Sequence, residues 1–445
     1  MGRRQDRSRQ GGKIDGVGKT VVVGAGVIGL LAAYELARKG EQVVVYDKGQ
    51  PGAACSAGNA GWIVPSFSGP LPAPGLVGGT LRSMVNPACP IYVRPRLDLD
   101  LARWLWGFWR RCNSGDYDAG YEATALLNRR TMACFDALEA DGVEFEMHRA
   151  GLLFVFLSRA GRDRHAHDLA RLPNHGYAPP RELSGATVRE MEPALSPAVA
   201  GGLLLEAERH VRPETLAAGL AHRLAGMGVP IGAGVEVTGV VRRGREVRAV
   251  VTREGEVAAD RVLVAAGAWS GILARRIGFS LPVLPGKGYS ITVSRPALRL
   301  GRALHLSEAR IACSPFRDAL RIAGTVEITS VTADVSPIRI AAIRNAAGRY
   351  LKDWARGSGE VEWMGMRPFL PDGLPAIGRA PGFDNVYVAA GHGMLGITLA
   401  PVTGAVIADL MVRGTAGRDL TPFDPGRFTR ARGAPGMYAS IGPIA

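Results

Sequence analysis

Apolar positions early in the chain follow the order strand, turn, helix, strand. Residues 20–23 form a short β-branched run, which is typical of a strand buried on both faces. Residues 24–29 read Gly-Ala-Gly-Val-Ile-Gly, and residues 30–39 have helical spacing. A second β run, residues 43–46, ends at Asp47. The pattern therefore predicts a βαβ unit with a glycine-rich turn.

The glycines of this turn have separate tasks in a dinucleotide-binding fold. Gly24 permits the tight turn, Gly26 lets the backbone approach a pyrophosphate, and Gly29 lets the helix pack close to the strand. The helix N-terminus offers free N–H groups to phosphates, and Asp47 is placed to bind a ribose. The small, polar stretch 53–61 can pass close to the second half of a dinucleotide, either NAD or FAD. The residues predicted to bind are Gly24, Gly26, Val27, Ile28, Gly29, Asp47, Lys48, Ser56, Asn59, Ala60 and Gly61.

A second glycine cluster lies near the C-terminus. Residues 385–390 have the pattern of a strand, residues 391–396 repeat the Gly-x-Gly-x-x-Gly spacing, and residues 397–411 have helical periodicity. No further strand with a terminal acid follows, so this is not a second complete βαβ unit. We expect the strand to join the first sheet and the helix start to face the other end of the same cofactor. The residues concerned are Gly391, His392, Gly393, Met394, Leu395, Gly396, Ile397 and Thr398.

A third segment in the middle of the chain also has β patterning. Residues 234–241 and 247–251 predict a hairpin, and residues 260–269 predict a strand that ends in small side chains. Small side chains there allow the backbone to pass close to the dinucleotide. The residues predicted to bind are Val237, Ala266, Gly267 and Trp269.

Composition narrows the class of protein. A chain of 445 residues suits two domains, and the net charge of +14 is spread over scattered arginines with no nucleic-acid reading motif, so nucleic acid is not expected as a partner. Five widely spaced cysteines without Cys-x-x-Cys argue against a disulfide scaffold or a metal site and for the cytoplasm. His165 and His167 are expected to be solvated loop residues. No cleavable apolar region follows the basic residues of the tail at 1–18, which we expect to be disordered or to touch anionic lipid.

The three segments, in this order, resemble the D-amino-acid oxidase-like family of FAD-dependent oxidoreductases. Within it the chain is most similar to bacterial D-amino-acid dehydrogenases, on residues 58–61, 284–290, 365–368, 372–375 and 391–396. The resemblance implies an α/β fold: a discontinuous Rossmann-like FAD-binding domain with an inserted α+β substrate domain built on an antiparallel sheet. The implied boundaries are 19–96, 206–278 and 365–425 for the FAD-binding domain, 97–205 and 279–364 for the substrate domain, and 426–445 for a tail.

The resemblance also implies the chemistry. Arg367 matches the family's arginine that holds the substrate carboxylate. Tyr289 is a candidate to donate its hydroxyl to that carboxylate or to line the pocket, and the alternative is a core or rim tyrosine. The implied activity is oxidative deamination of D-amino acids by hydride transfer from Cα to flavin N5, with electrons passed to a quinone or an electron-transfer protein. Two alternatives stay open: a D-proline or D-hydroxyproline dehydrogenase, and an oxidase of glycine, sarcosine or D-amino acids that uses oxygen.

An amphipathic helix is predicted over residues 97–112. Leu97, Leu101, Trp104, Leu105 and Phe108 fall on one side, and Arg103, Arg110 and Arg111 on another. One interpretation is packing onto the substrate domain. The other is peripheral contact with the inner face of the cytoplasmic membrane, where reduced flavin would meet quinone.

Overall fold

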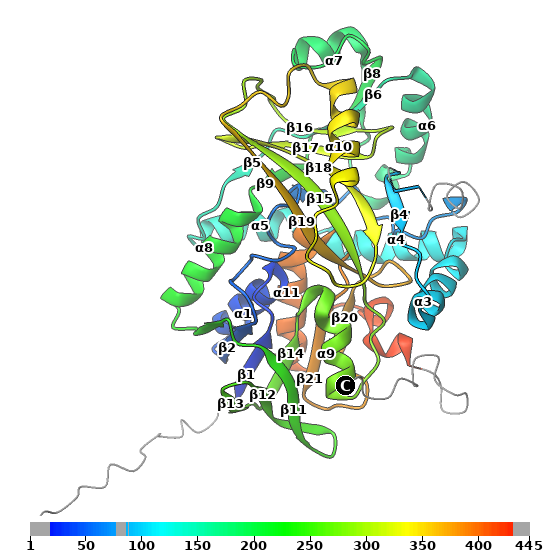
Figure 1. The fold of residues 1–445 in the computed structure, drawn as a ribbon. Coiled ribbons are helices and arrows are strands. Elements are labelled where there is room, and N and C mark those ends of the chain that lie inside the picture. The colour runs from blue at the N-terminus through cyan, green and yellow to red at the C-terminus, as the bar shows by residue number, and fades with distance from the viewer. Residues whose placement is uncertain (1–17, 77–85, 88, 430–445) are drawn as a thin grey trace, which may run out of the picture.

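The computed structural model describes residues 18–76, 86–87 and 89–429, and these form two domains built on two separate sheets. In Figure 1 a parallel sheet with its helices lies in the lower half and a larger, mainly antiparallel sheet lies in the upper half. This mixed α/β arrangement confirms the fold class predicted from the sequence. Of the tails predicted at 1–18 and 426–445, residues 1–17 and 430–445 lie outside the described residues.

The parallel sheet is assembled from segments that are far apart in the sequence. Its strand order is β10-β2-β1-β14-β21-β20, and all neighbours are parallel except β20, which runs antiparallel to β21. The predicted C-terminal strand therefore joins the first sheet, beside β14. The strands are β1 (Lys19–Val23), β2 (Gln42–Asp47), β10 (Ile231–Ala233), β14 (Arg261–Val264), β20 (Ala376–Arg379) and β21 (Val386–Ala390).

Helices cover one face of this sheet in a continuous apolar core. Helix α1 (Val27–Arg38) packs against α11 (Gly396–Arg413) and α8 (Pro213–Gly226). Two helices within the predicted substrate domain, α4 (Ser114–Asn128) and α5 (Thr131–Ala140), also contact α11 and share this core. By length and composition α11 could cross a membrane, but 67% of it is buried inside the protein, as in a core helix.

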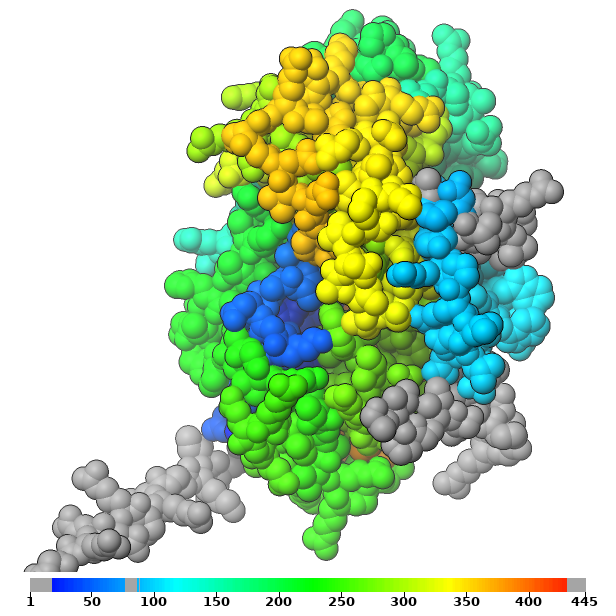
Figure 2. All heavy atoms as spheres, in the orientation of Figure 1, coloured from blue at the N-terminus to red at the C-terminus, as the bar shows by residue number. Residues whose placement is uncertain are grey.

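The other face carries α9 (Ser270–Ile277) and a small antiparallel sheet. Its strands are β11 (Val237–Arg243), β12 (Glu246–Thr252) and β13 (Gly255–Ala258), so the predicted hairpin is present and has a third strand. In the space-filling view, blue residues of the N-terminal segment lie at the surface between green and yellow residues (Figure 2). The view therefore shows segments distant in sequence meeting where the domains join.

The second domain is a sheet of nine strands in the order β19-β15-β18-β17-β16-β6-β8-β7, with β4 beside β18. Only the β16–β6 and β18–β4 pairs are parallel among its described pairs. Helix α10 (Pro337–Tyr350) packs on β15 and β18, and α6 (Arg159–Leu169) and α7 (Gly185–Met191) contact β8. The strands are β4 (Ile91–Val93), β6 (Leu152–Phe156), β7 (Arg181–Ser184), β8 (Gly201–Leu205), β15 (Leu284–Ser294), β16 (Ala303–Leu306), β17 (Ile311–Pro315), β18 (Ala319–Ile328) and β19 (Gly359–Phe369).

Two smaller elements complete the frame around the site. A short antiparallel sheet contains β3 (Trp62–Ile63), β9 (Arg209–Val211) and β5 (Met147–His148). After residue 425, where the predicted FAD-binding domain ended, the 3-10 helix Pro425–Phe428 still packs on this domain: Arg427 Nε donates to Asp372 at 2.7 Å.

Helix α3 (Leu99–Arg110) begins at Asp98, whose carboxylate accepts from the N–H of Asp100 and Leu101. Its buried residues Leu101, Trp104 and Phe108 share a core with residues of β15, β18 and β19, which agrees with the packing interpretation. The predicted helix began at residue 97, but Leu97 precedes α3, is fully exposed and is not part of this core.

Candidate active site

A cavity of about 1270 Å³ lies between the parallel sheet and the antiparallel sheet. It is lined by the glycine-rich turn after β1, the loop 53–61, the end of β14, strand β19 and the turn before α11. Most residues predicted to bind the cofactor line it. The exceptions are Gly29, Gly391 and Thr398, which lie just behind the wall.

The turn after β1 leaves no room for a side chain at Gly24 or at Gly29. Gly24 has a φ of 112°, and a Cβ there would lie 2.4 Å from the carbonyl oxygen of Ala265. A Cβ at Gly29 would lie 1.8 Å from the carbonyl oxygen of Gly24, which explains why Gly29 supports the turn without lining the cavity. The hydroxyl of Ser56 accepts from Val27 N–H at 2.9 Å, so the loop 53–61 is tied to the start of α1. The close approach of backbone that a pyrophosphate needs is therefore present.

The end of β2 has groups suited to the adenosine half of a dinucleotide. Asp47 accepts from Ala25 N–H at 2.7 Å and from Gly49 N–H at 2.8 Å, and each carboxylate oxygen keeps a second acceptor position. Lys48 Nζ lies 3.7 Å from the centre of the Trp269 ring. Burial lowers the pKa of Lys48.

The loop 58–61 is held by three strands of the antiparallel sheet. Ser290 donates to the carbonyl of Gly58 at 2.7 Å, Arg321 to that of Asn59 at 3.0 Å, and Ser314 to that of Ala60 at 2.6 Å. Glu214 binds both Gly58 N–H and the Arg321 guanidinium. The sequence does not predict these anchors, because no local pattern shows which strands cross above a loop.

The second glycine turn closes the cavity from the side of α11. Gly393, with a φ of 53°, donates its N–H to the carbonyl of Pro368 at 2.9 Å. The ring of His392 is 3.0 Å from the hydroxyl of Thr403, and burial lowers the pKa of His392 to about 3, so this histidine is neutral. Thr398 Oγ1 donates to the carbonyl of Trp62 and accepts from Val64 N–H. Thr398 therefore positions the wall behind the turn.

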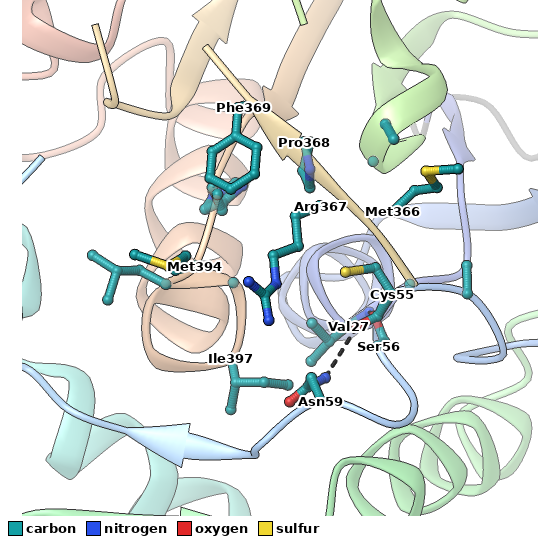
Figure 3. Close-up of a pocket in the computed structure, with 18 of the residues that line it drawn as sticks. Val27, Cys55, Ser56, Asn59, Met366, Arg367, Pro368, Phe369, Met394 and Ile397 are labelled. Atoms are coloured by element: carbon teal, nitrogen blue, oxygen red, sulfur yellow. Dashed lines mark hydrogen bonds between the residues drawn. The ribbon is translucent and has the colours of Figure 1, made fainter. Parts of the chain in front are cut away.

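Arg367 on β19 extends into the middle of this cavity. In Figure 3 its guanidinium lies between Met394 and Cys55, with Ile397 and Asn59 beyond it. No described residue forms an ion pair or hydrogen bond with the guanidinium, and burial lowers its pKa. A half-buried cation without an acidic partner is costly, and a ligand carboxylate would offset that cost through two parallel hydrogen bonds.

Tyr289 does not line the cavity, contrary to its predicted role as a carboxylate donor or pocket residue. Arg367 pairs with Gly286, so Gly286 and Gly288 share its face and Tyr289 points to the opposite face. There Tyr289 is 1% exposed, and its hydroxyl donates to Glu327 at 2.5 Å. It is a core tyrosine.

The expectation for His165 was also wrong. His165 lies on α6, not in a loop, and it lines the cavity. Trp62, Phe67 and His305 line the same region and were not identified from the sequence. They come from separate elements whose meeting leaves no signal in the local pattern.

Comparison with known proteins agrees with this geometry. Residues 19–410 match the family described as FAD dependent oxidoreductase, DAO. The chain is 34% identical over 407 residues to a D-amino acid dehydrogenase of Cereibacter sphaeroides, covering 88% of this chain and 91% of that protein. It is 33% identical over 420 residues to one of Sinorhizobium medicae, covering 92% and 100%. Glycine oxidase from Geobacillus kaustophilus has a similar structure, with a TM-score of 0.73 at 26% identity over 92% of this chain and 99% of that one.

The residues present fit the cofactor of this family. The side-chain-free turn at Gly24 and Gly29 suits a pyrophosphate, Asp47 suits a ribose, and the turn at residues 391–396 and the anchored loop 58–61 flank the far end of the same cavity. FAD is therefore the cofactor, and the acceptor that it supplies when bound is flavin N5. The match over residues 19–410 shows that the chain belongs to the DAO family of FAD-dependent oxidoreductases.

Proposed function

We propose that this protein is an FAD-dependent D-amino acid dehydrogenase. The observation that carries the proposal is Arg367, whose guanidinium lines the cavity and has no acidic partner within the described parts of the chain. A zwitterionic amino acid bound there by its carboxylate is fixed in orientation, because the two N–H···O bonds are parallel. The names of the relatives at 34% and 33% identity support the D configuration.

The protein's contribution is mainly orientation and exclusion of water. Arg367 holds the carboxylate, and the antiparallel sheet and the turn at residues 391–396 enclose the Cα–N bond. Loss of hydride from Cα, with release of the amine proton, turns the amine into an imine. Water then converts the imine to a 2-oxo acid and ammonia.

An anaerobic panel of D- and L-amino acids tests this function. Purified FAD-loaded protein is mixed with each amino acid without oxygen, and absorbance at the flavin band is followed. We expect bleaching by D-amino acids and little by their L forms. A flavin that no amino acid reduces would refute the proposal.

One exposed surface, on helix α3, bears on the identity of the electron acceptor. Trp106 and Trp109 are each 50% exposed, with ring centres 4.8 Å apart, and Arg103, Arg110 and Arg111 flank them on the same segment. Aromatic and basic side chains together suit an anionic lipid surface. We propose that α3 contacts the inner face of the cytoplasmic membrane peripherally and that reduced flavin passes its electrons to quinone. Flotation with vesicles containing anionic lipid tests the contact: wild-type protein should float, and a Trp106→Glu, Trp109→Glu variant should not.

A second candidate is an oxidase that passes electrons to oxygen. The structural similarity to glycine oxidase favours it. Measuring oxygen uptake beside reduction of a dye separates the two: a dehydrogenase reduces dye with little uptake, and an oxidase consumes one oxygen for each amino acid.

A further inference from the structure

One part of the cavity that Arg367 lines is walled by rings, and we call it the aromatic compartment: Trp62, Phe67, Phe156, His165 and His305. The rings form a connected cluster. His305 is 5.8 Å from Trp62 and 6.3 Å from Phe67, centre to centre, and His165 is 5.6 Å from Phe156. Phe154 lies behind them and connects the two groups: its ring centre is 5.4 Å from Phe67, 5.0 Å from His305 and 4.8 Å from His165. This shape suits a flat group more than a flexible chain.

The aromatic compartment adjoins the carboxylate anchor through the second glycine turn. Gly393 binds the carbonyl of Pro368, the residue after Arg367, and Leu395 packs against the core that contains Phe154 and Phe156. The carbonyl of Trp62 is bound by Thr398 at the start of α11. A ligand held by Arg367 at one side of this turn therefore has the aromatic compartment at the other.

Small residues of the sheet keep the floor of this region open. His305 pairs with Ala312 on β17, and Ala312 pairs with Ala323 on β18, so the three face the same side. All three line the cavity. Two alanines in the centre of a sheet leave the room that larger side chains would fill.

The aromatic compartment carries no net charge. Burial lowers the pKa of His305 to about 3 and that of His165 below its usual value, so both rings are neutral near pH 7. At the exposed rim, Arg164 and Arg310 are balanced by Asp168 and Glu308. A charged group of a ligand, anionic or cationic, would therefore have no opposite charge to pair with among the rings.

We propose that the aromatic compartment receives the substrate's side chain and that the protein prefers amino acids with a large, uncharged aromatic side chain. This inference rests on the proposed function, because it takes Arg367 as the carboxylate anchor. The preference arises from apolar area buried against ring faces, which a methyl side chain cannot provide.

Carboxylates that lack the amine test the preference apart from catalysis. Isothermal titration calorimetry of the FAD-loaded protein compares 3-phenylpropanoate, propanoate and succinate, which carry the phenylalanine, alanine and aspartate side chains. We expect the Kd of 3-phenylpropanoate to be lower than that of propanoate by about ten-fold or more, and the Kd of succinate to be no lower than that of propanoate. Equal binding of all three, or tightest binding of succinate, would overturn the inference. If none binds and no amino acid bleaches the flavin, the proposed function fails as well.

Two variants locate the effect. Ala312→Leu fills the aromatic compartment and should reduce the preference for 3-phenylpropanoate over propanoate about five-fold or more. Phe67→Leu removes a ring and should reduce the same ratio, which covers the case that Ala312→Leu does not fold. Ala207→Leu, an exposed alanine outside the cavity, is the matched control and should leave the ratio unchanged. A ratio unaffected by both cavity variants would place the aromatic ligand elsewhere.

Discussion

Gly288 and Arg367 lie on the same face of adjacent strands, and a Cβ at Gly288 would lie 2.6 Å from Cζ of Arg367. The guanidinium therefore crosses directly over the backbone of β15. Any side chain at 288 would push it aside. Because the obstructed atoms are the far end of a flexible side chain, the fold itself can tolerate the change.

Gly288→Ala should therefore affect substrate binding more than stability. We expect KM for a D-amino acid to rise about ten-fold, equivalent to about 1.4 kcal/mol, with the flavin still bound. Steady-state kinetics and the flavin-to-protein absorbance ratio measure the two effects. Gly359→Ala on β19 is the control, since a Cβ there meets nothing within 4 Å. An unchanged KM in the Gly288 variant would show that the position of the guanidinium does not matter.

A side chain added to the glycine-rich turn after β1 should weaken the binding of FAD. In Gly29→Ala the added Cβ would lie 1.8 Å from the carbonyl oxygen of Gly24, and backbone cannot move aside cheaply. We expect the purified variant to contain little FAD, measured by absorbance after extensive dialysis. Gly226→Ala in α8 meets nothing within 4 Å and should keep its FAD and gain up to about 1 kcal/mol of stability. A yellow Gly29 variant with full FAD content would contradict this account of the turn.

From the contacts of Arg321 we expect the affinity for FAD to depend on the antiparallel sheet above the loop 58–61. Arg321 is 5% exposed and joins the carbonyl of Asn59 to the carboxylate of Glu214. Arg321→Met should loosen the loop and raise the Kd for FAD about ten-fold, measured by titrating the apoprotein. Arg317→Met, an exposed neighbour, should have no effect. Equal affinities in both variants would remove the loop anchors from the account.

The buried carboxyl of Glu208 should make the free energy of unfolding depend on pH. Glu208 is 4% exposed, and burial raises its pKa from 4.5 to about 7. The unfolded chain releases this proton near pH 4.5 while the folded chain keeps it until about pH 7. The protonated Glu208 carboxyl therefore makes its whole contribution to the free energy of unfolding below pH 4.5, and this contribution is lost as the pH rises to about 7.

Replacing this carboxyl with an amide should remove that loss. We expect the fall in unfolding free energy between pH 5 and pH 8 to be smaller in Glu208→Gln, by on the order of 2 to 3 kcal/mol. Urea unfolding at the two pH values measures it. Glu206→Gln, an exposed neighbour, is the control. The same pH slope in wild type and Glu208→Gln would mean that the buried carboxyl is not protonated.

The sequence predicted the features that depend on residues close together in the chain. The strand, glycine turn and helix at residues 19–38 are specified locally, and the second glycine turn at residues 391–396 could be assigned to the same cofactor because its βαβ unit is incomplete. The place of Tyr289 could not be predicted. Side chains alternate along a strand, so the face of Tyr289 depends on the register of β15 against β19, which only the folded sheet defines.

The anchors of the loop and the aromatic compartment were missed for the same reason. Ser290, Arg321 and Ser314 lie on three strands and converge on consecutive carbonyls only after the sheet forms. Phe67 and His305 are far apart in the sequence and meet in the cavity wall. Such convergence depends on pairings between distant segments and leaves no periodic pattern in either one.

The rate of anaerobic flavin reduction in Arg367→Met tests the central claim most directly. Methionine keeps much of the side-chain volume and removes the charge that would hold the carboxylate. We expect the variant to retain its FAD. Stopped-flow absorbance, followed at increasing concentrations of a D-amino acid, should give a Kd for that amino acid about a hundred-fold or more above the wild-type value, which corresponds to about 3 kcal/mol. Reduction of Arg367→Met with the Kd and rate of the wild-type protein would contradict the account.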